Sequence, residues 1–165
     1  MAIASLIASE NISAGNAVYV TSAGLAAKAD ALTEAKASVA GIAVDTVSTG
    51  GIVRINVDGV YSGYSGLTPG EFRFLSITTA GSLVSYDEFA AELATVLPDV
   101  YLTNVGRVIT STTISIEIIP PQLVLNPTTI LLLETSTEFS VQGLLLEDGS
   151  NIDLETATDR DWETS

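Results

Sequence analysis

The chain contains no cysteine and no histidine among its 165 residues. Without cysteine there can be neither disulfides nor thiolate chemistry, and the redox compartment stays undefined. Without histidine the chain lacks the commonest general base and a frequent metal ligand, so Ser-His-Asp and Cys-His catalytic arrangements are excluded. No apolar run approaches the ~20 residues of a membrane-spanning helix. We therefore expect neither an enzyme nor a membrane protein.

Basic residues are also scarce: six Lys and Arg stand against twenty Asp and Glu, for a net charge of −14. Binding to nucleic acid needs clustered cations that neutralise phosphates, and anionic membrane surfaces attract the same residues, so neither is an expected partner. The acidic excess is concentrated in residues 120–165, which carry nine acids and one base. This excess either serves solubility or attracts a basic partner surface.

The most informative pattern present is a strand-turn sequence that occurs twice. A glycine leads into a β-favouring run, which is followed by a Ser/Thr-rich turn, a second glycine and a leucine. Two further segments follow in the same order in each half. The paired ranges are 15–25 with 70–83, 38–44 with 103–109, and 51–57 with 112–118. The repeat predicts an all-β fold, a compact β-barrel or β-sandwich built from two related strand units.

Helical signals are few in this sequence. Ser85 followed by Glu88 forms a capping box, which predicts one short helix over residues 86–97. The Ala-rich stretch 25–37 is ambiguous, because its propensity favours a helix whereas the repeat places a strand and a loop there.

A composition change divides the chain near Pro120–Pro121, two residues that cannot donate to a β-ladder. We therefore predict a β-domain over residues 1–119 and an acidic C-terminal extension over 120–165. Within the extension, residues 128–156 are expected to form short strands and residues 157–165 a polar tail.

Searches for catalytic and ligand motifs are negative. Gly63–Gly66 lacks the Gly-x-Ser-x-Gly spacing of a nucleophile elbow. Asp148–Glu155 is rich in oxygen ligands but lacks the spacing of a calcium loop, which favours a solvated turn. A glycosidase-like carboxylate pair is not singled out. We accordingly predict no catalytic, cofactor-binding or metal-binding residues.

Three aromatic residues are candidates for partner binding: Tyr61, Tyr64 and Trp162. Their rings would serve as stacking platforms if the chain were a carbohydrate-binding, adhesive β-module. Trp162 lies alone in the acidic tail, where it is either an anchor on a partner or a loosely packed terminal residue.

Several glycine- and alanine-rich runs carry a family resemblance. They are Gly15–Val20, Gly24–Ala29, Ala37–Ala43, Gly50–Gly59 and Val105–Val108. Together they resemble the capsid decoration proteins of tailed phages, also called cement or head-stabilisation proteins, over about residues 10–119. The resemblance implies a structural virion protein that binds the outside of a phage head, often as a homotrimer, with the major capsid protein as its partner.

An alternative within the same class is a tail, baseplate or head-fibre component. The LLLE sequence at 131–134 recurs at 144–147, and this echo resembles repeats in phage fibre proteins.

Overall fold

The computed structural model describes residues 2–96 and 99–125 of the chain. Its described part is mainly β, which confirms the predicted fold class. The elements in chain order are β1 Ile3–Ile7, β2 Ala17–Val20, β3 Ala26–Lys28, α1 Glu34–Ala37, β4 Val39–Ala43, β5 Ile52–Asn56, β6 Gly59–Ser62, β7 Phe72–Leu75, β8 Leu83–Val84, α2 Tyr86–Leu93, β9 Val100–Leu102, β10 Asn104–Thr110, β11 Thr113–Ile116 and β12 Gln122–Val124.

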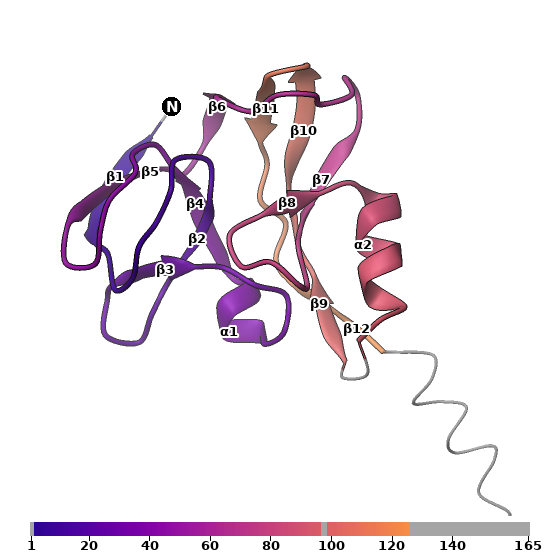
Figure 1. The fold of residues 1–165 in the computed structure, drawn as a ribbon, viewed down its shortest axis with the longest axis horizontal. Helices are drawn as coiled ribbons and strands as arrows, with labels where there is room; N and C mark the ends of the chain where they lie inside the picture. The colour runs from indigo at the N-terminus through magenta and orange to yellow at the C-terminus, as the bar shows by residue number, and fades with distance from the viewer. Residues whose placement is uncertain (1, 97–98, 126–165) are drawn as a thin grey trace, which may run out of the picture. The chain divides into compact units, whose positions relative to one another are not determined.

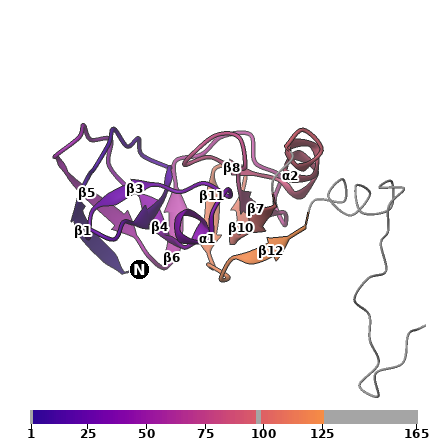
Figure 2. The same ribbon diagram turned by 90° about the horizontal axis from the view of Figure 1, so that it is seen from below.

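Most of the strands belong to two five-stranded antiparallel sheets, which Figures 1 and 2 show beside each other. The first sheet has the order β1-β5-β4-β2-β3, and the second has the order β6-β11-β10-β7-β8. Strands β9 and β12 pair separately. Strand for strand, the two orders are the same, with β1 corresponding to β6, β5 to β11, β4 to β10, β2 to β7 and β3 to β8.

The residue pairing is the same as well. In the first sheet Ala17 pairs with Ile42, Val18 with Gly41 and Tyr19 with Val39. The corresponding pairs in the second sheet are Phe72 with Arg107, Arg73 with Gly106 and Phe74 with Asn104. Each ladder skips one residue at the same step, a β-bulge in β4 and again in β10. The repeat read from the sequence is therefore a structural duplication.

The two sheets share one hydrophobic core. The first sheet contributes the outward side chains of β2 and β4, including Ala17 and Ile42, and the second contributes residues that include Leu75, Val108 and Ile114. A second core lies within the first sheet, where Ile12 covers Val18, Val53 and Ile55. A third core joins α2 to the second sheet through Phe89 and Phe74. The face of the first sheet that carries Ala17 and Ile42 therefore packs against the apolar side chains of the second sheet.

Direct hydrogen bonds also join the two halves of the chain, through residues that lie outside the two five-stranded sheets. The buried hydroxyl of Thr103 donates to the Ala37 carbonyl oxygen over 2.9 Å, and the Tyr101 amide donates to the carbonyl oxygen of Ala31 over 2.8 Å. Thr103 is completely buried, so this hydrogen bond supplies the partner that its hydroxyl needs away from water.

Helix α2 begins where the sequence predicts it to begin. The Ser85 hydroxyl accepts from the Glu88 amide, and the Glu88 carboxylate accepts from the Ser85 amide, which completes the capping box. The helix ends at Leu93, four residues before the predicted end. In the ambiguous stretch 25–37 the structure has both expected elements, the strand β3 and the four-residue helix α1, so the described residues contain two helices instead of one.

No sheet in residues 2–96 and 99–125 closes into a barrel. In the first sheet the segment that follows β1 meets the other edge strand, β3, through an isolated bridge between Ala8 and Ala26. Strand β12 follows Pro120–Pro121 yet pairs with β9. The prolines therefore do not end the β-domain, because the chain returns to it immediately after them. The expected strands in 128–156 and the tail 157–165 lie outside the described residues.

Candidate interaction surface

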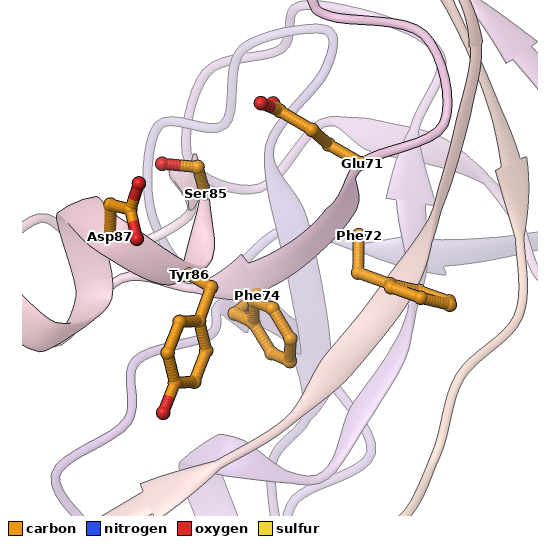
Figure 3. A pocket seen from close by; sticks show the side chains of 6 residues that line it. All are labelled: Glu71, Phe72, Phe74, Ser85, Tyr86 and Asp87. Atoms are coloured by element: carbon orange, nitrogen blue, oxygen red, sulfur yellow. The ribbon is translucent and has the colours of Figure 1, made fainter.

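A hollow of about 340 Å³ lies between β7 and the start of α2 (Figure 3). Its lining residues come from the two ends of one short segment: Glu71, Phe72, Phe74, Ser85, Tyr86 and Asp87. Phe72 and Phe74 share one face of β7 because alternate residues of a strand point to the same side. Tyr86 and Asp87 are placed by the capping box, which fixes the first turn of α2. Local sequence thus positions both walls.

Aromatic side chains dominate this surface. Tyr86 is 63% exposed and Phe72 45% exposed, although both are large. The Tyr86 and Phe74 rings lie side by side in Figure 3, with an edge-to-face contact at 5.9 Å between centroids. The guanidinium of Arg107 lies 5.6 Å from the centroid of the Phe72 ring, close enough for a cation–π contact. Clustered exposed aromatic residues are typical of protein interfaces.

The rim of the hollow is acidic, and the buried side chain of Arg73 binds two carboxylates. Arg73, only 8% exposed, donates to Glu71 over 3.2 Å and to Glu88 over 3.5 Å. A hydrogen bond from the Ser85 amide holds the pKa of Glu88 below its usual value, and the nearby Arg73 guanidinium contributes to the same effect. Asp87 extends from the first turn of α2 at the rim (Figure 3). The Nε atom of Arg73 has no hydrogen-bond partner, so this buried cation is not fully satisfied.

The predicted binding residues lie elsewhere. Tyr61 is buried in the core shared by the two sheets, and Tyr64 packs against it, 5.2 Å away between centroids. The Tyr64 hydroxyl donates to the Gly15 carbonyl oxygen over 2.8 Å, and burial raises its pKa. These rings fill the junction of the sheets instead of presenting a face for stacking. Trp162 lies outside the described residues.

Sequence reasoning did not identify Phe72, Phe74 and Tyr86. The repeat predicts a strand within residues 70–83 but does not assign either face of that strand to the core. In the structure the charged Arg73 is buried while the apolar Phe72 is exposed. A period-two pattern shows that two faces differ, and only packing decides which one is covered.

The described residues contain no group of three or more acidic side chains arranged to hold a metal ion. No helix among them is long and apolar enough to cross a membrane. No protein-family model, curated protein or solved structure matches the chain. The arrangement as a whole offers a surface for contact, with aromatic walls and an acidic rim.

Proposed function

We propose that this chain is a structural virion protein that binds the outer surface of a tailed-phage capsid and stabilises the assembled head. The observation that carries the proposal is the duplicated β-scaffold, whose repeated turns are the segments that resemble capsid decoration proteins. The exposed aromatic surface beside α2 supports a role in contact with other proteins. The proposed partners are the major capsid protein and further copies of the chain, and no catalytic role is assigned.

A protein of this kind stabilises a shell by mass action. If it binds the assembled capsid and not its separated subunits, each bound copy shifts the equilibrium toward assembly. Sites on a capsid repeat at fixed spacing, so a chain that self-associates gains avidity and needs only modest affinity at each site. The acidic charge of the chain complements a basic capsid surface and would make binding weaker as salt increases.

Decoration-free heads of the phage that encodes the chain provide the test. Purified full-length protein is added to them, and bound protein is measured by co-sedimentation together with the temperature at which the heads release DNA. We expect saturable binding and a raised release temperature. Heads that already carry their full complement of the protein are the control and should bind no more. Failure of the bare heads to bind the chain would overturn the proposal.

Location separates this proposal from the tail, baseplate and head-fibre alternatives. Cryo-electron microscopy of virions is expected to place the chain on the head surface, and density at the tail would instead favour the alternatives. The carbohydrate-binding alternative gains nothing from Tyr61 and Tyr64, since both rings pack within the fold.

A further inference from the structure

We infer that copies of this chain associate head to tail, with the turn around Gly24 of one copy seated in the hollow between Phe72 and Tyr86 of the next. The inference rests on the duplication of the two sheets and holds whether or not the protein binds a capsid. It names two surfaces that are different from each other, so one copy can engage two neighbours.

The hollow has a counterpart in the first sheet, and that counterpart is filled. Ala17 and Tyr19 stand where Phe72 and Phe74 stand, as their pairing partners show. Tyr19 pairs with Ala27, and Phe74 pairs with Val84. Two residues beyond these partners come Ala29 and Tyr86, which places Ala29 at the position of Tyr86. Ala17 and Ala29 are both completely buried.

The group that fills the first-sheet position is the turn between β7 and β8. The Gly81 amide donates to the Ala29 carbonyl oxygen over 2.7 Å, and the Gly81 carbonyl oxygen accepts from the Ala17 amide over 2.8 Å. The side chain of Asn16 contacts Gly81 so closely that any added Cβ would collide with it. In this way a glycine turn from the second sheet is inserted between two segments of the first.

The equivalent turn of the first sheet is unoccupied by any neighbour in the described part of the chain. Gly24 precedes β3 by two residues, as Gly81 precedes β8, and the two have φ values of +75° and +81°. A Cβ at Gly24 would meet nothing within 4 Å. Beside the turn, Val20 is 45% exposed, whereas its counterpart Leu75 is fully buried at the junction of the sheets.

Within its described residues, each chain therefore offers an exposed turn and an open hollow, and the turn around Gly81 and the first-sheet position that it fills are the same pair of features joined within the chain. The contact between copies would differ in detail from the contact that the Gly81 turn makes within one chain. Aromatic rings replace two alanines in the hollow, and α2 begins at Tyr86, so the contact would bury ring surface where Gly81 forms two backbone hydrogen bonds. Because the two surfaces differ, the contact is heterologous and produces a ring if the rotation closes.

The absence of cysteine allows a direct test by cross-linking. Ala23→Cys places a thiol in the exposed turn, and Asp87→Cys places one at the rim of the hollow. The two full-length proteins are mixed, oxidised and analysed on a non-reducing gel. We expect a disulfide-linked dimer in the mixture at many times the amount formed by either protein alone. The matched control replaces Asp87→Cys with Ser111→Cys, an exposed position in the β10–β11 turn, and should give only background.

A second measurement uses light scattering of the full-length chain. Phe72→Asp should lower the solution mass toward that of the monomer, whereas Val60→Asp should leave it unchanged. Both substitutions put a charge on a side chain that is about half exposed in the second sheet, but two strands, β11 and β10, separate β6 from β7. Circular dichroism checks that both variants are folded. If Phe72→Asp does not fold, the cross-linking experiment still tests the inference.

A wild-type chain that remains monomeric at every accessible concentration would overturn the inference. A mixed pair that cross-links no better than the control pair would do so too, because the hollow would then have another occupant. Neither measurement involves capsids, so this failure is distinct from failure to bind heads.

Discussion

Gly41 and Gly106 occupy equivalent positions in the two sheets, and neither position has room for a side chain. A Cβ at Gly41 would collide with the carbonyl oxygen of Asn56, and one at Gly106 would collide with that of Ser115. In both cases the obstructing group is backbone of the adjacent strand, which cannot rotate away. Close approach of β4 to β5, and of β10 to β11, therefore requires glycine at these two positions.

Replacement of Gly106 by alanine should destabilise the fold by about 1–3 kcal/mol, since the added methyl group forces two strands apart. Gly66→Ala is the control for backbone strain alone, because Gly66 has φ +70° and an added Cβ would meet nothing within 4 Å. Urea unfolding at constant pH measures both variants. A loss for Gly106→Ala well below about 1 kcal/mol would show that the strands adjust around the methyl group.

Stability should fall as the solution is acidified. Asp45 accepts two hydrogen bonds of 2.7 Å from Arg54, which hold the pKa of its carboxyl below the usual value. A lowered folded-state pKa means that the unfolded chain binds protons more readily, so this stabilisation is present at neutral pH and is lost as pH falls below about 5. The urea midpoint is expected to decrease over that range.

Asp45→Asn should make the acid-induced decrease smaller, since the variant no longer carries that carboxyl. Glu34→Gln is the matched control, because it removes an exposed carboxyl that forms no ion pair in the described structure. An unchanged pH dependence in Asp45→Asn would contradict the assignment of this pair.

Arg73→Met should leave the free energy of unfolding unchanged within about 1 kcal/mol, or raise it. Burial of a charge is costly, and apolar replacements of similar volume are often neutral or stabilising. The first sheet supports this expectation, because the counterpart of Arg73 is the fully buried Val18. Urea unfolding of the wild type and the variant measures the difference in the free energy of unfolding. A large loss of stability in the variant would mean that the ion pairs of Arg73 with Glu71 and Glu88 outweigh the cost of burying its charge.

Glu92→Ala should destabilise the attachment of α2 by about 2 kcal/mol, the scale expected for loss of several hydrogen bonds to one carboxylate. The carboxylate of Glu92 accepts from the Ser76 hydroxyl, the Ile77 amide over 2.6 Å and the Thr78 hydroxyl. Hydrogen exchange at Ile77 should increase in the variant. Glu34→Ala, a change at an exposed residue of α1, is expected to leave that exchange rate as it is in the wild type.

Local patterns predicted much of the secondary structure. Glycines at matching places marked the turns of both halves, and alternation marked β5 and β11. The Ser85 and Glu88 pair located the start of α2, because a capping box depends only on residues three apart. The helix end was predicted too late, since residues that follow Leu93 continue the apolar pattern without continuing the helix. Helix α1 is too short for its periodicity to be recognised.

The sequence by itself determined that this protein is a duplicated β-scaffold, because strands and glycine turns are encoded by neighbouring residues. Only the tertiary structure decided which surfaces are covered. Ala17 and Phe72 hold the same place in their sheets, yet a turn from the second sheet buries Ala17 and none in the described residues covers Phe72. Burial depends on what packs against a strand from far away in the chain, and a local pattern does not contain that information.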